Sequence, residues 1–409
     1  MNLKFEIFVD KYLIGILLRL LNYPIAAMSK LLQKKHLLVQ PKTIVICKFK
    51  GMGSIIQATP LIQTLSFNFP DSEIIFLSTT TNKPILDKIP EISEQILIND
   101  RHFLSFLLSF NNSIFRLLKK SPSVFIDLEV YSNFSSLVSI LCLSKNRLGF
   151  YINPGYYKRG IYTQMMYYNT RSPISDTYLQ FARMMGTEKL ITDIKLQKES
   201  NMQVLDRFGL SSGKYIIVNP NASDLRIERR WPRENFQILI QKLLPEFPDF
   251  KMVIIGSDIE VEYCSIFEQT EQLVNTCGKT SLDELSGLIK GSYFVISNDT
   301  GPMHLSFAFQ KSCFALFGPC SPDQYGNQPT AIPIYTNLYC SPCIHEFQQA
   351  PCNGNNICMK SIDVSMVFQA ILNWKNKSQP IIKTDSGILY EYTNKTGQNA
   401  IVGKMNFRE

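Results

Sequence analysis

The sequence contains no apolar run long enough to cross a bilayer, which needs about 20 residues in succession. The most apolar stretch near the N-terminus, residues 12–21, is interrupted by Arg19. Glu6 and Asp10 precede it and no small-residue cleavage site follows, so we expect no secretory signal. Two interpretations of the amphipathic segment 1–40 remain open: a helix in the membrane interface, and a helix packed on the protein's own surface.

Charged residues are few, at 19% of 409 residues, whereas 45% are hydrophobic, which indicates a globular chain long enough for two cores. The net charge of +8 favours acidic partners such as a nucleotide diphosphate, a phosphorylated glycolipid or an anionic membrane. No dense Lys/Arg run with interleaved aromatic residues occurs, and no nucleic-acid-binding motif is recognised, so we expect no nucleic-acid partner.

Ten cysteines are too few and too scattered for a disulfide scaffold, and most lie singly in apolar segments typical of a core. Four others fall close together and could hold a tetrahedral zinc ion, although the last two are spaced more loosely than in a zinc ribbon. Reduced thiols in a cytosolic loop are the favoured interpretation, with a structural staple as the alternative. These cysteines are Cys340, Cys343, Cys352 and Cys358.

The most informative motif begins at Asn298, where an apolar strand predicted over 293–297 gives way to a helix. Pro302 suits the first helical turn, whose free N–H groups and positive dipole end favour an anion. Gly301 allows close approach of a ligand, Thr300 adds a hydroxyl, and His304 lies one turn later. This junction predicts a phosphate site, with an ordinary capped helix start as the alternative.

Several segments resemble glycosyltransferase family 9, the ADP-heptose:lipopolysaccharide heptosyltransferases. NDTGPMHLSFAF at 298–309, followed by ALFGPCSPDQYG, resembles the signature of the family. Residues 48–65 resemble its amino-terminal glycine loop and helix, 216–236 its inter-domain donor segment, and 275–301 the stretch leading into the phosphate site. Together these segments cover most of residues 43–374.

Two alternations of strand and helix predict two doubly wound α/β domains. We expect an N-terminal domain over 41–200, a C-terminal domain over 213–374 and a polar, poorly ordered or peripheral tail over 375–409. The resemblance implies the GT-B architecture, in which two Rossmann-like domains face a cleft, the first binding the acceptor and the second the nucleotide-sugar donor. The strands predicted from the residues are 43–47, 74–77, 124–128, 215–218, 252–255, 293–297 and 313–317, and the resemblance implies a further short strand at 147–150.

Transfer of a sugar from a nucleotide diphosphate requires a stabilised leaving group and an oriented sugar. Thr300, Gly301 and Pro302 at the helix start, with His304 behind them, can bind diphosphate oxygens. The resemblance implies that Asp299 hydrogen-bonds a sugar hydroxyl, and a role as a helix N-cap can coexist with it.

The resemblance also assigns donor contacts outside this motif. The family usually has a Lys two residues before the Trp that corresponds to Trp231, and here Arg229 supplies the positive charge, as a bidentate fork. Asn221 lies in a segment for which the resemblance implies polar contacts to the phosphates. Glu260 matches a family position that contacts the ribose.

The glycine turn Gly51-Met52-Gly53 follows the first strand and is expected to form a tight turn close to the acceptor. A dinucleotide-binding enzyme is not expected, because the full GxGxxG and the downstream ribose-binding acid are both absent. The family commonly has an Asp directly after the second glycine as general base, whereas this chain has Ser54.

A serine hydroxyl cannot take a proton unassisted near neutral pH, so either a different group acts as the base or the protein does not catalyse. Glu129 is the first candidate, because the strand over 124–128 should deliver it to the end of the first sheet, and Asp127 is the second. Most carboxylates that follow strands are only caps or solvated side chains, and that alternative stays open.

The sequence therefore predicts an inverting glycosyltransferase that moves a heptose or related sugar, with ADP-heptose the expected donor, to a lipopolysaccharide core or similar glycan. We expect no required cofactor and no catalytic metal, with magnesium accompanying the diphosphate left open, and a place at the cytoplasmic face of the membrane. The alternative is a nucleotide-sugar-binding or scaffold protein that lost catalysis with the change to Ser54.

Overall fold

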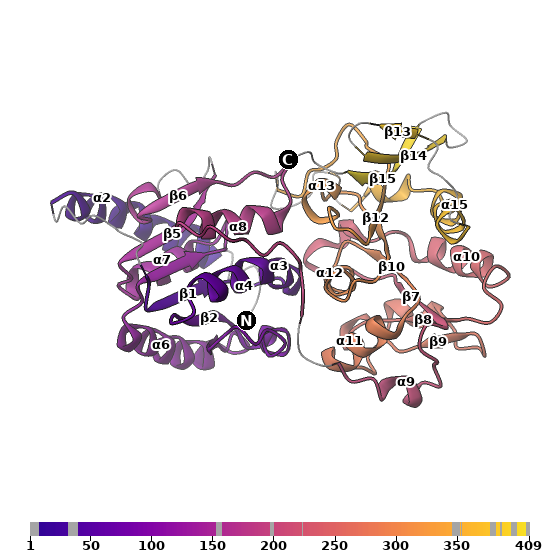
Figure 1. Ribbon diagram of the computed structural model, residues 1–409, viewed down its shortest axis with the longest axis horizontal. Helices are drawn as coiled ribbons and strands as arrows, with labels where there is room; N and C mark the ends of the chain where they lie inside the picture. The colour runs from indigo at the N-terminus through magenta and orange to yellow at the C-terminus, as the bar shows by residue number, and fades with distance from the viewer. Residues whose placement is uncertain are drawn as a thin grey trace. The chain divides into compact units, whose positions relative to one another are not determined.

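The computed structural model folds into two compact units (Figure 1). Unit 1 comprises residues 1–169 and 175–198, and unit 2 comprises residues 170–174 and 199–409. The structure describes residues 8–31, 40–152, 158–196, 200–222, 224–345, 352, 354–376, 382–384, 387–393 and 399–405.

Unit 1 is built on a parallel sheet of six strands in the order β3-β2-β1-β4-β5-β6. The strands β1 and β4 are buried along their whole length, as expected when both faces of a parallel sheet are covered. The strands are β1 Thr43–Cys47, β2 Glu73–Thr79, β3 Glu94–Ile98, β4 Val124–Asp127, β5 Asn146–Tyr151 and β6 Gln164–Tyr167. The helices are η1 Val9–Ile14, α2 Gly15–Leu31, α3 Met52–Gln57, α4 Thr59–Asn68, η2 Thr80–Asn82, α5 Lys83–Leu86, α6 Phe103–Lys120, α7 Asn133–Leu141 and α8 Ile174–Met184.

Unit 2 repeats the pattern with six parallel strands in the order β12-β11-β10-β7-β8-β9, and three antiparallel strands extend the sheet beyond β12. The parallel strands are β7 Tyr215–Asn219, β8 Lys251–Ile254, β9 Leu273–Asn275, β10 Val295–Asn298, β11 Cys313–Leu316 and β12 Ala331–Tyr335. The antiparallel strands are β13 Ile382–Thr384, β14 Gly387–Thr393 and β15 Asn399–Met405, and they come from the segment expected to be a tail. The helices are α9 Val204–Arg207, η4 Asp224–Arg229, α10 Arg233–Leu243, η5 Asp258–Glu260, η6 Tyr263–Ile266, α11 Leu282–Gly291, α12 Gly301–Ala308, α13 Pro322–Tyr325, α14 Ile357–Lys360 and α15 Val364–Lys375.

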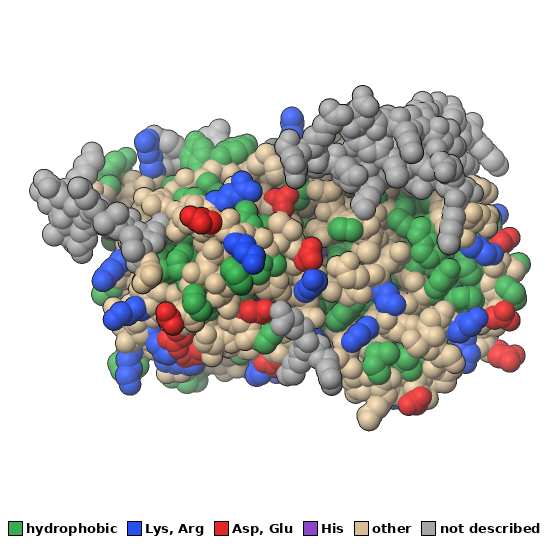
Figure 2. Space-filling model, in the orientation of Figure 1, with side chains coloured by type: hydrophobic (Ala, Val, Ile, Leu, Met, Phe, Trp, Pro, Cys, Tyr) green, Lys and Arg blue, Asp and Glu red, His purple; other side chains and the backbone are tan. Residues whose placement is uncertain are grey.

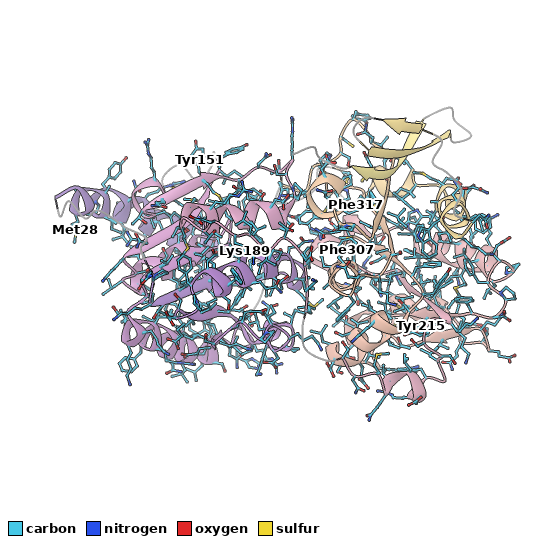
Figure 3. All side chains as sticks on the ribbon, in the orientation of Figure 1. Met28, Tyr151, Lys189, Tyr215, Phe307 and Phe317 are labelled. Carbon is cyan, nitrogen blue, oxygen red and sulfur yellow. The ribbon has the colours of Figure 1, made fainter. Side chains whose placement is uncertain are left out.

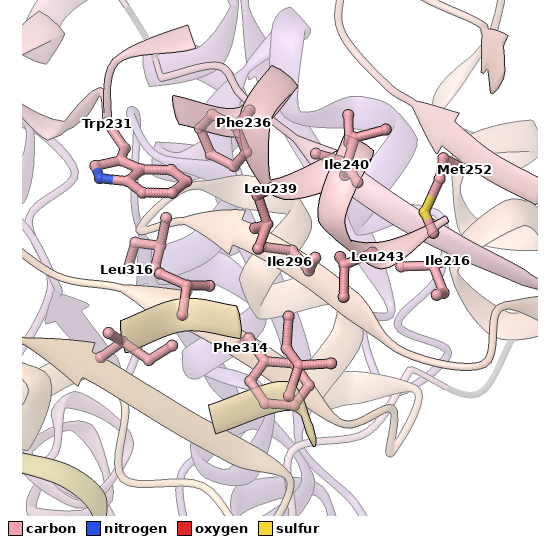
Figure 4. Packing of buried hydrophobic residues seen from close by; sticks show 14 of the residues in the cluster. Ile216, Trp231, Phe236, Leu239, Ile240, Leu243, Met252, Ile296, Phe314 and Leu316 are labelled. Atoms are coloured by element: carbon pink, nitrogen blue, oxygen red, sulfur yellow. The ribbon is translucent and has the colours of Figure 1, made fainter. Parts of the chain in front are cut away.

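The core of unit 2 forms where α10 packs on the sheet (Figure 4). Trp231 is fully buried against Phe236, with ring centroids 4.8 Å apart. Its indole Nε1 donates to the carbonyl of Ile362 at 2.8 Å, so its polar atom is satisfied inside the core. The chain just before α10, which contains Arg229, is therefore held rigidly.

Two doubly wound α/β units confirm the fold class that the strand pattern predicts. Among the described residues, no helix combines the length and the apolar character needed to cross a membrane. On the face drawn in Figure 2, basic side chains are scattered over both units and do not gather into one patch.

Candidate functional site

The predicted phosphate motif lies at the carboxyl end of β10, between its parallel neighbours β7 and β11. Asn298 ends the strand and α12 begins at Gly301, so Asp299 and Thr300 form the junction. The carboxyl ends of strands are where open α/β sheets bind ligands. Unit 2 thus has a candidate site at the place that the sequence predicts.

Asn298 organises this junction from within. Its Nδ2 donates to the carbonyls of Pro220 at 2.9 Å and Asn221 at 3.2 Å, and its Oδ1 accepts from the amide of Trp231 at 3.2 Å. The side chain is completely buried. It therefore ties the loop after β7 and the segment before α10 to the end of β10.

Asp299 is the most unusual residue of the site. Its side chain is 3% exposed, and neither carboxylate oxygen has a hydrogen-bond partner among the described residues. Arg229 lies beside it, with Nη1 3.6 Å from Oδ2 and donating to the main-chain oxygen of Asp299 at 3.2 Å. Nε of Arg229 also has no partner in this described region. A buried carboxylate without donors is costly, and both of its oxygens keep their capacity to accept hydrogen bonds.

The start of α12 offers fewer amides than its sequence suggests. Pro302 has no N–H, and the amides of Met303 and His304 turn back to the carbonyl of Thr300 at 3.1 and 3.4 Å. The hydroxyl of Thr300 accepts from Nδ2 of Asn219 at 2.8 Å, which fixes its orientation. An anion at this helix start would therefore have to be bound by the amide of Gly301, the helix dipole and the neighbouring guanidinium.

His304 lies behind Asp299 and is 6% exposed, with Nε2 3.9 Å from Oδ1 of the carboxylate. Burial, opposed by Asp299 and assisted by Arg229, lowers the pKa of His304 to about 4. The imidazole is therefore neutral at neutral pH. It can serve as a hydrogen-bonding group toward a ligand but not as a cation.

We predict that His304 makes unit 2 acid-sensitive. The unfolded histidine binds a proton below about pH 6.5 and the folded one only below about pH 4, so stability falls as the pH drops through that window. The expected loss between pH 7 and pH 5 is about 2 kcal/mol, and His304→Gln should lose that much less than the wild type. Both tryptophans, Trp231 and Trp374, belong to unit 2, so urea unfolding followed by tryptophan fluorescence measures this unit alone. Equal losses in the two proteins would contradict the assignment.

Four further residues gather at the site without having been singled out from the sequence. The ring of Tyr325 on α13 lies 6.0 Å from that of His304 and 6.3 Å from that of His345. Nε2 of His345 lies 2.7 Å from Oε1 of Gln324, and burial lowers the pKa of His345 to about 4. Burial also raises the pKa of the Cys320 thiol, which faces Arg229 and Asp299. The only sequence signal for Cys320, Gln324 and Tyr325 is their position in the PCSPDQY stretch after β11, and His345, in the loop after β12, has none.

Two predicted donor residues already have protein partners. Nδ2 of Asn221 donates to the carbonyl of Ile255 at 2.7 Å, and the side chain is 2% exposed. Oε2 of Glu260 accepts from the amide and hydroxyl of Ser257, both at 2.8 Å, which forms a capping box. The roles of Asn221 at the phosphates and of Glu260 at the ribose stay predictions. Asn221 can act there only through its backbone unless it exchanges its partner.

The glycine turn lies at the carboxyl end of β1 in unit 1. Gly51 has φ of +92°, which favours glycine, and its carbonyl accepts from the amide of Ser54 at 3.0 Å. Met52 and Gly53 begin α3. The Ser54 side chain hydrogen-bonds to the hydroxyl of Tyr178 on α8. The turn is thus fixed by its own backbone and by a neighbouring helix.

Glu129 lies at the end of the first sheet, beside the residues that lead into the glycine turn, and its oxygens are occupied. Oε2 accepts from Nζ of Lys48 at 2.8 Å, and Oε1 accepts from the amides of Phe49 and Lys50 at 2.8 and 3.1 Å. Burial favours the neutral acid, but Lys48 and the two amides outweigh it and lower the pKa of Glu129. The carboxylate is therefore ionised, and it can take a proton only by giving up part of this network.

The pKa of Asp127 is shifted in the opposite direction to that of Glu129. Burial raises its pKa to about 6, although the hydroxyl of Tyr162 donates to it at 2.5 Å and Lys158 lies nearby. Its side chain is completely enclosed. A pKa near 6 suits a general base, but the enclosed side chain of Asp127 cannot contact a substrate directly in the described conformation.

The four clustered cysteines do not form a metal centre in the part of the chain that the structure describes, where no three His, Cys, Asp or Glu residues are arranged to hold a metal ion. Cys340 and Cys352 are exposed, Cys343 is half-buried and Cys358 is buried, and none forms a disulfide. Most of the segment between Cys343 and Cys352 lies outside the described residues. A structural role for these thiols stays a prediction.

The model of glycosyltransferase family 9 (heptosyltransferase) matches residues 173–353. Lipooligosaccharide heptosyltransferase 2 of Campylobacter jejuni is 24% identical over 333 residues, 79% of this chain and 95% of that protein. Lipopolysaccharide heptosyltransferase 2 of Escherichia coli is 22% identical over 289 residues, 66% of this chain and 81% of that protein.

Solved structures show the same fold. The structure of E. coli ADP-heptose lipopolysaccharide heptosyltransferase II has a TM-score of 0.64 and 22% identity, covering 82% of this chain and all of that one. A glycosyltransferase family 9 protein from Veillonella parvula has a TM-score of 0.66 and 19% identity, covering 82% of this chain and 98% of that one. The fold is thus that of GT-B-like heptosyltransferase structures, and residues 173–353 of the chain match glycosyltransferase family 9 (heptosyltransferase).

Proposed function

We propose that this protein transfers a heptose from ADP-heptose to the core of lipopolysaccharide or a closely similar glycolipid. The observation that carries the proposal is the buried, unpartnered carboxylate of Asp299 beside Arg229 at the start of α12. A carboxylate suits sugar hydroxyls, and a guanidinium at a helix start suits a diphosphate. ADP-heptose is the preferred donor because relatives with this fold are named for it.

In this proposal the leaving diphosphate is stabilised by groups of unit 2. Arg229 and the amide of Gly301 would neutralise the charge that develops on the departing oxygen, and neutral His304 would add a hydrogen bond. Thr300 would contribute through its fixed hydroxyl. No cofactor is required in this scheme, and Arg229 would take the part that a divalent cation plays elsewhere, although magnesium accompanying the diphosphate is compatible with it.

We infer that unit 1 binds the acceptor beside the glycine turn, where Glu129 is the first candidate for the base. Its ionised carboxylate has the required protonation state, but its bond to Lys48 makes it a weak base. An acceptor hydroxyl would have to replace one of its present donors. Asp127 would support the base through the same edge of the sheet and not touch the substrate.

Glu129→Gln separates a catalytic role from a structural one. A general base typically contributes a factor of about 100 to 10,000 in rate, so we expect a loss of at least about 100-fold in transfer with ADP affinity retained. Lys48→Gln breaks the same ion pair and leaves the carboxylate in place. If both variants lose equal stability and equal activity, the pair is structural and the base hypothesis is wrong.

The wild-type protein tests the function itself. Incubation with ADP-heptose and a truncated lipopolysaccharide acceptor should release ADP only when both are present. Release of ADP without acceptor, or from another nucleotide sugar only, would contradict the proposed substrates. Binding of ADP with no release would favour the alternative of a donor-binding protein that lost catalysis, which Ser54 and the occupied Glu129 suggest.

Because such an acceptor is a glycolipid, we also propose that the protein works at the cytoplasmic face of the inner membrane. The named activities of the relatives support this place. Fractionation of cells into soluble and membrane pools, with and without a salt wash, would test it.

A further inference from the structure

The helices η1 and α2 near the N-terminus are fastened to unit 1 by one face. Oδ1 of Asp10 accepts from the amides of Asn133 and Phe134 at 3.0 and 2.7 Å, so it caps the first turn of α7. One turn apart on α2, Leu18 is fully buried, and Oδ1 of Asn22 accepts from the amide of Gly160 at 2.5 Å. Directional hydrogen bonds and a buried leucine thus hold this segment to α7 and to the loop that contains Gly160.

The opposite face of the same segment is apolar and exposed. Six large side chains there are between 41% and 78% exposed, and their spacing by three or four residues places them in one stripe. We call this set the outward stripe; it consists of Tyr12, Leu13, Ile16, Leu17, Leu20 and Tyr23. Met28, labelled in Figure 3 near the outer end of α2, is also exposed, at 59%. An apolar stripe of this size on a helix already packed by its other face indicates a docking surface.

The charge of the segment indicates what docks there. Residues 1–40 contain six Lys or Arg and two acidic residues, a net charge of +4, which is half the net charge of the chain in a tenth of its length. Asp10, one of the two acids, is used in capping α7. Lys11 on η1 and Arg19 on α2 are exposed. An apolar stripe with surplus basic charge is typical of helices that lie in the surface of an anionic bilayer.

The attachment point places this surface near the expected acceptor edge of unit 1. Asp10 caps α7, which begins at Asn133, four residues after Glu129. Nζ of Lys158 donates to the carbonyl of Ser132 at 2.7 Å and lies near Asp10, Asp127 and Glu129. The outward stripe is therefore anchored to α7, which follows Glu129 at the carboxyl end of β4, next to β1 and its glycine turn.

We propose that the outward stripe lies in the interface of an anionic lipid bilayer, with α2 parallel to the surface. Aliphatic and tyrosine side chains enter the headgroup region while Lys and Arg meet anionic headgroups. Binding of the protein to the bilayer does not require the sugar donor. The further idea, that this binding brings a glycolipid acceptor to unit 1, rests on the function proposed above.

The test uses the full chain and flotation with vesicles made of equal parts phosphatidylethanolamine and phosphatidylglycerol. The wild type should float with these vesicles and not with phosphatidylcholine vesicles, and added salt should weaken the binding without abolishing it. The double variant Ile16→Asn and Leu20→Asn should lose at least about tenfold in partition coefficient, because two aliphatic side chains no longer leave water.

The matched control is Leu104→Asn with Leu108→Asn on α6, which changes two leucines of similar exposure and the same spacing. This variant should float as the wild type does, and circular dichroism should confirm that all three proteins are folded. The proposal is overturned if the α2 variant floats unchanged, if the α6 variant alone loses binding, or if light scattering shows that the α2 stripe forms a dimer that does not bind vesicles. Since ADP binding is measured separately, failure here is distinguishable from failure of the proposed activity.

Discussion

Replacement of Asp299 by Asn is expected to reduce sugar transfer by at least about 100-fold without lowering the thermal stability of unit 2. Loss of one group that stabilises a transition state or orients the sugar typically costs a factor of about 100 to 1000. The carboxylate has both oxygens free of protein donors among the described residues, so its bonds are left for a ligand. An asparagine side chain keeps the shape but offers one acceptor oxygen where two are needed.

The Asp299→Asn variant should lose activity without losing thermal stability. A carboxylate that is 3% exposed loses its hydration, and Arg229 at 3.6 Å repays only part of that cost. Asp299→Asn would remove the buried charge, so the unfolding temperature should stay the same or rise. A residue that weakens the fold while serving a ligand is typical of a functional site.

A matched control, a variant of Asp363, is expected to lose stability and keep activity. Asp363 caps α15, where Oδ1 accepts from the amide of Ser365 at 2.7 Å. Asp363→Ala should cost about 1 kcal/mol of stability and leave transfer unchanged. Initial rates with ADP-heptose and tryptophan-fluorescence melts of both variants make the comparison. Full activity in Asp299→Asn would show that the unpartnered carboxylate has no part in transfer.

The second large effect is expected at Arg229, whose neighbour Arg230 provides a contrast. Arg229→Met should weaken ADP binding by about 100-fold, which corresponds to about 3 kcal/mol for a lost charge-assisted contact with the diphosphate. Arg229→Lys keeps the charge and should stay within about tenfold of the wild type. Isothermal titration calorimetry measures the ADP affinity of the wild type and of both Arg229 variants. Because the Met variant leaves Asp299 without its counter-charge, it should also melt at a lower temperature, and binding is measured well below that point.

Arg230 points to the protein and not to the ligand. Its Nε and Nη2 donate to the carbonyl of Ala222 at 3.0 and 2.7 Å, and its guanidinium lies 4.6 Å from the ring centroid of Tyr263. Arg230→Met should therefore lower stability by about 1–3 kcal/mol and change ADP affinity only a few-fold. Equal losses of affinity in the Arg229→Met and Arg230→Met variants would contradict the division of roles.

The layout of both units could be predicted from the sequence, because runs of buried β-branched residues followed by glycine turns mark the parallel strands. The transition from strand to helix after Asn298 could also be predicted from the sequence, because Gly301 and Pro302 mark the helix start. The parallel strands β3, β6, β9 and β12 are not among the predicted strands, because β3, β6 and β9 carry polar residues and β12 contains a proline, which weaken the strand pattern. Whether such a segment forms a strand depends on its packing against neighbouring strands, which the local sequence does not reveal.

The site could be predicted only in part, because side-chain partners depend on pairings distant in the sequence. The strand pattern places Glu129 at the end of the first sheet, yet its bond to Lys48 joins residues 81 positions apart across β1 and β4. The same limit applies to Asn221, which is held by the end of β8, and to His345, which comes from a loop after β12. For α2, the pattern indicated an amphipathic helix, but only the packing shows which face is covered.

The most direct test of the account is hydrogen–deuterium exchange of the wild-type protein with and without saturating ADP. Donor binding at the carboxyl ends of β7, β10 and β11 predicts slower exchange in peptides that contain Gly301 to His304, the loop after Asn219 and the segment of Arg229, with little change at the glycine turn of unit 1. Protection confined to residues 48–54, or ADP binding that leaves the start of α12 unchanged, would contradict the placement of the donor site in unit 2.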